Sequence, residues 1–182
     1  TLVSKGKLGK DSIATFAAGV WAGILPEDDR DEWLKKYVST IEYGGGLYDE
    51  EWMNVMLDEM YDRLLDMERW GVEWEKTPDG KFKRVEARWK TLQCMFHGPQ
   101  MMEAMARKVK GSGVKVVGHT MITDLLTEHG KPEQPVIGAV GFDVRTGTFR
   151  VFKAKATILA AGACSFKARF ACMRFQTGEA YA

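Results

Sequence analysis

Apolar residues recur every three or four positions over two stretches in the first half of the chain. Before the first stretch, Pro26 and the mainly acidic residues 27–31 suit a helix start, because proline fits the first turn and carboxylates favour the positive end of the helix dipole. The apolar residues that follow at helical spacing are Trp33, Leu34, Tyr37, Val38 and Ile41. Glycines 44–46 predict the end of this helix.

A second helix is expected to open at the acidic residues 49–51 and to end at Gly71. Its apolar stripe consists of Trp52, Val55, Met56, Met60, Leu64, Met67 and Trp70. Pro78, Asp79 and Gly80 predict the turn of a hairpin over residues 74–84. A third helix is predicted over residues 101–109, with residues 111–113 ending it.

The last third of the chain changes from a helical to a β period. Short β-rich runs, separated by turns, are predicted at residues 114–117, 120–126, 136–143, 148–153 and 157–160. A short apolar strand that ends at Ser4 is predicted at the start of the chain. This order of elements indicates an α/β fold with a helical insertion and an antiparallel β excursion.

Two of the predicted strands run directly into turns built from small residues. The first strand opens into a loop rich in glycine, lysine and small residues between Lys5 and Gly19, and the last runs into residues 160–163. Because bulky side chains are absent from both turns, the backbone could approach a ligand closely and offer N–H donors to a phosphate or a flavin.

These motifs, in this order, resemble the flavoprotein subunits of the fumarate reductase and succinate dehydrogenase superfamily, which includes L-aspartate oxidase and the adenylylsulfate reductase α subunit. The resemblance covers nearly the whole chain. The positions that carry it are Ser4, Lys5, Gly6, Ser12, Ala18, Gly19, Val20, residues 70–72 and 77–81, Ala160, Ala161, Gly162, Ala163, and Thr177 to Ala180.

The resemblance implies a Rossmann-like FAD-binding domain over residues 1–182 that is truncated at both ends. The first strand with its GxGxxG turn, and the capping domain that follows in the family, are missing from the sequence, so we expect an excerpt of a longer flavoprotein. The cofactor-binding residues that the resemblance implies are Ser4, Lys5, Gly6, Lys10, Asp11, Ser12, Ile13, Ala17, Ala18, Gly19, Thr120, Met121, Ile122, Ala160, Ala161, Gly162, Thr177 and Glu179.

Ser4 and Ser12 are the two polar positions on which the cofactor interpretation depends most. Ser4 is at the end of the predicted strand, where dinucleotide folds place the residue that meets the adenosine ribose; an ordinary strand end is the alternative. Ser12 occupies the register that in succinate dehydrogenases holds the histidine bonded to the flavin, so the resemblance implies FAD without a histidyl link here. Its hydroxyl could instead bond a phosphate or flavin carbonyl, or cap a helix beginning at Ile13.

Other positions favour particular members of the superfamily or leave the choice open. Ala14 and Ala17 replace an asparagine and a glutamine found in some relatives, which leaves the subfamily open, although residues 137–142 and 152–156 resemble adenylylsulfate reductase. In the family, the strand of Thr120, Met121 and Ile122 contacts the adenine through its main chain. The resemblance places Glu179 near the ribityl chain of the flavin, and the alternative is an acid favoured by a helix dipole.

Composition excludes several other function classes. The 26 basic and 25 acidic side chains nearly balance, which argues against a nucleic-acid or anionic-membrane surface, and no apolar run reaches the length of a membrane span. The three cysteines lack a CxxC pair and the three histidines lack ligand spacing, so no disulfide framework or metal site is indicated. His97 is a substrate-side candidate or a half-buried structural histidine, and Cys164 a small core residue or a redox thiol.

The resemblance implies an FAD-dependent oxidoreductase that transfers two electrons or a hydride at the flavin. It implies a small-molecule substrate, such as a dicarboxylate or another small anion, an iron–sulfur partner subunit, and a cytoplasmic location, either free or at a membrane face through that partner. No catalytic residue is assigned, because the family's substrate-binding arginines and histidine would lie beyond Ala182. The alternatives are an adenylylsulfate reductase α-like subunit and a flavin electron-transfer subunit without its own substrate site. A chain that binds no flavin is a third, since Ala163 and Ala180 replace family glycines.

Overall fold

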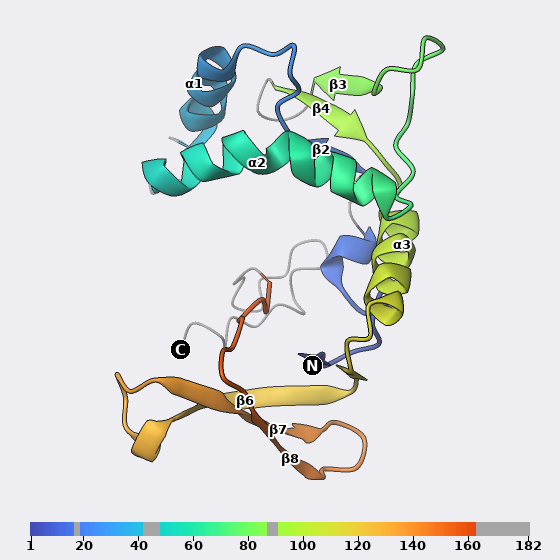
Figure 1. The fold of residues 1–182 in the computed structure, drawn as a ribbon. Helices are drawn as coiled ribbons and strands as arrows, with labels where there is room; N and C mark the ends of the chain where they lie inside the picture. The colour runs from blue at the N-terminus through green and yellow to red at the C-terminus, as the bar shows by residue number, and fades with distance from the viewer. Residues whose placement is uncertain (17–18, 42–47, 87–90, 163–182) are drawn as a thin grey trace. The chain divides into compact units, whose positions relative to one another are not determined.

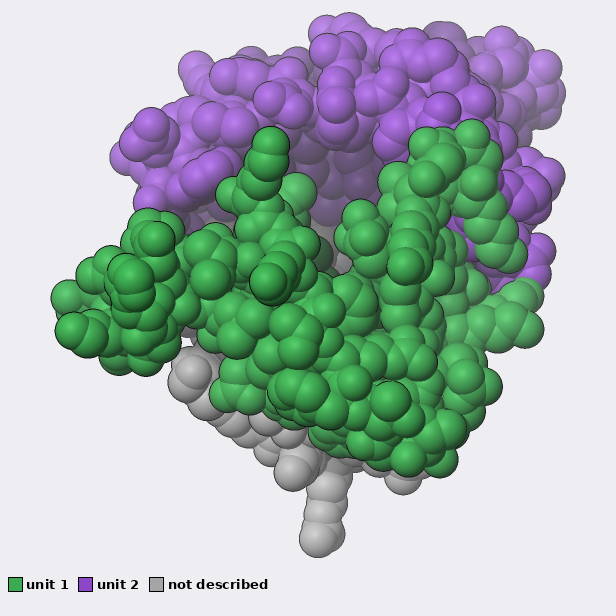
Figure 2. All heavy atoms as spheres, turned by 60° about the horizontal axis from the view of Figure 1, so that its bottom comes forward, with its two compact units in different colours: residues 1–16, 109–182 green, residues 17–108 purple. Residues whose placement is uncertain are grey.

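The computed structural model describes residues 1–16, 19–41, 48–86 and 91–162. The chain divides into two compact units, one of residues 1–16 with 109–182 and the other of residues 17–108 (Figure 2). Helices and both parallel and antiparallel strand pairs are present, so the predicted α/β class is confirmed.

The first unit contains a short parallel pair. Strand β1 (Leu2–Val3) pairs with β5 (Val116–Val117), with Leu2 opposite Val116. The Ser4 N–H extends the pairing by donating to the Val117 carbonyl at 3.0 Å. The predicted strand at the start of the chain is confirmed, and the strand predicted at residues 114–117 is reduced to its last two residues.

The first unit also contains an antiparallel meander of β6 (Thr120–Thr127), β7 (Val136–Asp143) and β8 (Phe149–Lys153) (Figure 1). The predicted bounds of β7 are reproduced, and those of β6 and β8 differ by one residue at one end. Between β6 and β7 lies the short 3-10 turn η3 (Glu128–Gly130). The predicted antiparallel excursion is therefore confirmed.

The prediction of a strand at residues 157–160 is wrong. These residues have no strand pairing in the described part of the chain, and the side chains of Ile158 and Leu159 are 93% and 55% exposed. A strand exists only where another strand supplies hydrogen-bond partners, and no described strand lies alongside this segment. The apolar composition of residues 157–160 could not show that they lack a described strand partner.

The second unit contains two of the predicted helices and most of the third. They are α1 (Arg30–Ile41), α2 (Glu50–Arg69) and α3 (Gly98–Gly111). Asp29 accepts the Glu32 N–H and Asp49 accepts the Trp52 N–H, so an aspartate caps each of the first two helices. Helix α3 begins three residues earlier than predicted, because Pro99 fits a first turn.

The buried face of α2 differs from the predicted stripe. Met53, Leu57, Met60 and Leu64 are buried, whereas Trp52 is 72% exposed. The helix is apolar over a wider arc than one stripe, so spacing alone could not select which part of the arc packs.

The second unit also contains a small sheet that the sequence did not predict. Its order is β2 (Val20–Ala22), β4 (Leu92–Met95) and β3 (Arg84–Glu86), all antiparallel. Strands of three or four residues are too short to show a β period.

In the first unit, the helix that the sequence allowed from Ile13 is only a 3-10 turn, η1 (Ile13–Phe16).

The hairpin over residues 74–84 is confirmed in its turn. The Gly80 N–H donates to the Thr77 carbonyl, and Gly80 has a φ of 85°, which glycine adopts without steric cost. An isolated bridge pairs Lys76 with Phe82, and another pairs Trp74 with Phe96 at the end of β4.

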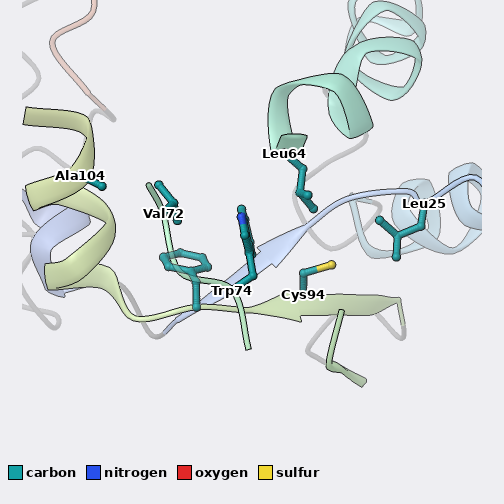
Figure 3. Close-up of a cluster of buried hydrophobic side chains, with 7 residues drawn as sticks. Leu25, Leu64, Val72, Trp74, Cys94 and Ala104 are labelled. Carbon is teal, nitrogen blue, oxygen red and sulfur yellow. The ribbon is translucent and has the colours of Figure 1, made fainter. Parts of the chain in front are cut away.

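The core of the second unit surrounds Trp74. Its ring meets Trp21, Phe82 and Phe96 edge-on, with centroid distances of 5.8, 6.1 and 5.5 Å. Trp74 belongs to a buried cluster that also contains Phe96. Figure 3 labels the other members of the cluster, which are Leu25, Leu64, Val72, Cys94 and Ala104. Burial raises the pKa of the Cys94 thiol to about 11, so this cysteine is a core residue and not a reactive thiolate.

A largely buried ion pair joins the loop before α1 to β3. The two terminal nitrogens of Arg84 donate to the two carboxylate oxygens of Asp28 at 2.8 and 2.7 Å, and the side chains are only 11% and 16% exposed. Asp28 also accepts the Leu25 N–H at 2.7 Å. The pair therefore fixes the loop that delivers Leu25 to the core.

Replacing Arg84 with methionine should destabilise the protein, because Asp28 is left charged and largely buried. We expect the free energy of unfolding in urea to fall by about 3 kcal/mol. The matched control is Lys83→Met on the neighbouring residue, whose partner Glu75 is half-exposed, with an expected change below about 1 kcal/mol. Equal losses in the two variants would contradict the role assigned to the Asp28–Arg84 pair.

Candidate cofactor site

The loop that follows β1 is held by bonds among its own residues. The N–H groups of Lys10 and Asp11 both donate to the Lys7 carbonyl at 3.1 Å. In return, the Lys7 N–H donates to the Asp11 carboxylate at 2.7 Å. The Asp11 carboxylate and the Lys7 main chain therefore close the loop into a ring before any ligand arrives.

Gly6 fits this ring only because it has no side chain. A Cβ at Gly6 would lie 2.3 Å from the Asp11 Cβ, well inside contact distance. On the other side, a Cβ at Gly118 would lie 3.2 Å from the Gly6 carbonyl oxygen. The loop thus passes close to the segment between β5 and β6, with glycine at both points of approach.

The loop presents positive charge to solvent. Lys5, Lys7 and Lys10 are exposed, and Asp11 is its one acidic residue. A cluster of ammonium groups over backbone that contains small residues suits an anionic ligand such as a phosphate. Lys7 was not among the predicted site residues, although its place between Gly6 and Lys10 was a signal.

Ser12 and Ile13 directly follow Asp11, the residue that closes the loop ring. The Ser12 hydroxyl is exposed and lies 3.2 Å from the Thr15 hydroxyl, which also donates to the Lys10 carbonyl at 3.2 Å. The Thr15 N–H donates to the Ser12 carbonyl. Ser12 therefore begins the 3-10 turn through its main chain, and not through the side-chain cap that was the alternative. Ser12 is therefore positioned by Thr15 and open to a ligand.

Thr120, at the start of β6, is joined directly to Ser4. The Thr120 N–H donates to the Ser4 carbonyl at 3.0 Å, and the Thr120 side chain is buried. Met121 and Ile122 pair across the sheet with Phe142 and Gly141. The fold thus brings Ser4, the basic loop and the predicted adenine strand together within one unit.

The remaining predicted site residues belong to the second unit, are exposed in residues 160–162, or lie outside the described ranges. Gly19 belongs to the second unit, where its φ is 84° and a Cβ would lie 2.3 Å from the Phe96 carbonyl oxygen, so main-chain packing already requires glycine. Ala160, Ala161 and Gly162 are exposed, and Gly162 has a φ of 85°. The four predicted residues that lie outside the described ranges are Ala17, Ala18, Thr177 and Glu179.

His97 and Cys164 are the other candidates from the sequence, and only His97 lies in the described ranges. His97 is exposed, and its carbonyl accepts the Met101 N–H in the first turn of α3. Cys164 lies outside the described residues. Among residues 1–16, 19–41, 48–86 and 91–162, the helices are too short or too polar to span a bilayer.

The donors in the first unit fit one part of FAD. Its phosphate groups need cations and closely approaching backbone, and the exposed lysines at positions 5, 7 and 10 beside Gly6 are groups of that kind. Its adenosine ribose needs a polar group at the end of a strand, and Ser4 is a polar residue at such a position. The position near the ribityl chain that the resemblance implies for Glu179 lies outside the described ranges.

A model of the FAD binding domain family matches residues 1–180 of the sequence. The chain belongs to this family. Its cofactor is accordingly FAD, and the resemblance drawn from the motifs is confirmed. The domain is similar to one of the subunits of the fumarate reductase (CoM/CoB) of Methanothermobacter marburgensis, with 29% identity over 170 residues, which are 88% of this chain and 30% of that protein.

The FAD binding domain is also similar to a second curated protein and to a solved structure. It is 27% identical over 160 residues to the fumarate reductase flavoprotein subunit of Mycobacterium tuberculosis, covering 84% of this chain and 26% of that protein. It also matches the structure of adenylylsulfate reductase from the hyperthermophilic Archaeoglobus fulgidus with a TM-score of 0.79 and 27% identity, over 100% of this chain and 30% of that one. The chain thus spans 26–30% of the length of these three relatives.

Gly6→Ala should weaken FAD binding, because the new methyl group displaces Asp11 and opens the loop ring. Overpacking of this kind costs about 1–3 kcal/mol, so we expect the Kd for FAD, measured by titrating the apoprotein, to rise about tenfold. Gly111→Ala is the control, since a Cβ there meets nothing within 4 Å.

The cause of the Gly6→Ala effect can be isolated with a second variant. In the Asp11→Gly background no Cβ remains to clash, so adding Gly6→Ala should change the Kd little further. If the two substitutions weaken FAD binding additively, the clash with Asp11 is not the reason for glycine at position 6.

Proposed function

We propose that the protein containing this domain is an FAD-dependent oxidoreductase of the fumarate reductase and succinate dehydrogenase type. The observation that carries the proposal is the family match over residues 1–180, joined to sequence similarity with fumarate reductase flavoprotein subunits. When bound, the flavin supplies two-electron or hydride transfer. The residues of this chain bind and orient it.

The described residues that hold FAD in this proposal belong to the first unit. Lys5, Lys7 and Lys10 face the pyrophosphate, Ser4 meets the adenosine ribose, and Ser12 offers its hydroxyl to a phosphate or a flavin carbonyl. Serine at position 12 lacks the imidazole of the family's histidyl link, so the flavin is held without that covalent bond. The proposal names no catalytic residue in this chain.

The partner, substrate and location in this proposal follow from the same similarity. A small anion such as a dicarboxylate is the proposed substrate class, and an iron–sulfur protein is the proposed electron partner. The proposed location is cytoplasmic, with a membrane face reached only through that partner.

An adenylylsulfate reductase α-like function is the second candidate. It is favoured by the match to the Archaeoglobus fulgidus structure, which covers 100% of this chain. Ala14, which replaces an asparagine found in that subfamily, argues against it. A flavin electron-transfer subunit without its own substrate site is the third.

Acid precipitation of the purified full-length protein tests the mode of FAD binding. We expect a visible flavin spectrum before precipitation and release of the flavin into the supernatant, because Ser12 carries no imidazole to form the family's histidyl link. Ser12→Ala should release it in the same way. Yellow colour in the pellet would mean that another residue tethers the flavin, and a colourless protein would overturn the proposed function.

Reoxidation of the reduced flavin by candidate substrates separates the three functions. With the flavin reduced by dithionite, fumarate should restore the oxidised spectrum if the protein is a fumarate reductase. Reoxidation by adenylylsulfate alone would support the second candidate. Reoxidation by neither, but by an artificial one-electron acceptor, would support a subunit without a substrate site.

A further inference from the structure

Asp143, the last residue of β7, is the buried centre of a polar network in the first unit. Its side chain is 3% exposed, and its Oδ1 accepts the N–H groups of Arg145 and Thr146 at 2.9 and 3.2 Å. Its Oδ2 accepts Nη2 of Arg150 at 2.6 Å. The Arg145 and Thr146 N–H groups and the charge of Arg150 hold the pKa of the Asp143 carboxyl below its usual value, so the carboxylate stays ionised at neutral pH.

Arg150 reaches across the meander from β8 to β6. Its Nη1 donates to the Thr120 hydroxyl at 3.0 Å, while its Nη2 holds Asp143. Residue 141, opposite Arg150 on the intervening strand, is glycine, and a Cβ there would lie 1.9 Å from the Met121 carbonyl oxygen. The close approach of the β6 main chain therefore requires glycine at position 141.

Thr120 is hydrogen-bonded both to Arg150 and to Ser4 near the start of the chain. Its hydroxyl accepts from Arg150 and lies 3.2 Å from the Gly118 carbonyl, to which it donates, so its rotamer is determined. Its N–H donates to the Ser4 carbonyl at 3.0 Å, and it is only 1% exposed. Thr120 therefore connects Arg150, through its hydroxyl, with Ser4, through its N–H.

We propose that Arg150 is a positioning residue for the adenosine end of FAD, acting through Thr120 on Ser4. The inference rests on the proposed function, since it takes FAD as the ligand and Ser4 as its ribose contact. Arg150 touches no part of the cofactor in this arrangement. A guanidinium suits the task because its planar fork serves two acceptors at once, which an ammonium on a flexible stem does less well.

The test measures ligand affinity of the apoprotein prepared from the full-length protein, with ADP as a probe of the adenosine half and FAD as the whole cofactor. Because Arg150→Gln removes charged hydrogen bonds to Thr120 and Asp143, we expect it to raise both Kd values about tenfold. Arg150→Lys should recover part of this loss. The matched control is Lys153→Gln, which removes the same charge from an exposed position on β8 and should leave both Kd values unchanged.

A double-mutant cycle distinguishes positioning from a general loss of structure. Thr120→Val removes the hydroxyl that links Arg150 to Ser4, so in that background Arg150→Gln should have little further effect on the Kd for ADP. The reduction potential of the bound flavin should be unchanged in Arg150→Gln, because the disturbance is confined to the adenosine end. If Arg150→Gln does not fold, Thr120→Val alone must still weaken ADP binding about tenfold.

The outcomes separate this inference from the proposed function. A wild-type protein that binds FAD, with Arg150→Gln lowering the melting temperature but leaving both Kd values unchanged, would overturn the positioning role alone. Additive effects of Arg150→Gln and Thr120→Val on the Kd for ADP would overturn it as well. A wild-type protein that binds neither FAD nor ADP would overturn both.

Discussion

The backbone of Ser4 is the point on which the first unit depends. Its N–H completes the parallel pair with β5, and its carbonyl accepts the first N–H of the antiparallel meander. One residue therefore belongs to two strand systems of opposite direction. Both main-chain groups of Ser4 are therefore hydrogen-bonded, and the loop that begins at Lys5 leaves the strand from a determined position. The basic loop and the proposed adenine strand meet because of this junction.

The polar groups around this junction form layers. The lysines and the Ser12 hydroxyl are exposed, and the Asp11 carboxylate closes the loop by accepting the Lys7 N–H. Behind the strand, the partly buried Arg150 joins Thr120 to Asp143, both of which are buried. A binding site needs side chains held in one geometry before the ligand arrives, and buried polar groups provide that rigidity only when each has its partner. The described part of the first unit meets this condition on the proposed adenosine side.

The second unit is organised by different forces. Aromatic rings meet edge-on around Trp74, and the Asp28–Arg84 pair holds the loop that brings Leu25 into the same core. Glycine at position 19 is required by the close approach of the Phe96 carbonyl. A residue proposed as a cofactor contact thus has a sufficient structural reason for its identity, which only the neighbouring strand reveals.

The sequence by itself determined the helices and the meander, because these depend on local periodicity, capping and turn chemistry. Its motifs carried the resemblance to the family and to the loop proposed to hold the cofactor. Helix α2, for example, is bounded by Asp49 and Gly71 in both prediction and structure. The tertiary structure decided which arc of α2 is buried, that β2, β3 and β4 form a sheet, and that residues 157–160 lack a described strand partner. It also decided that Arg150 and Asp143 are linked to Ser4 through hydrogen bonds of Thr120. Such features depend on contacts between residues far apart in the chain, which no local pattern of side chains encodes.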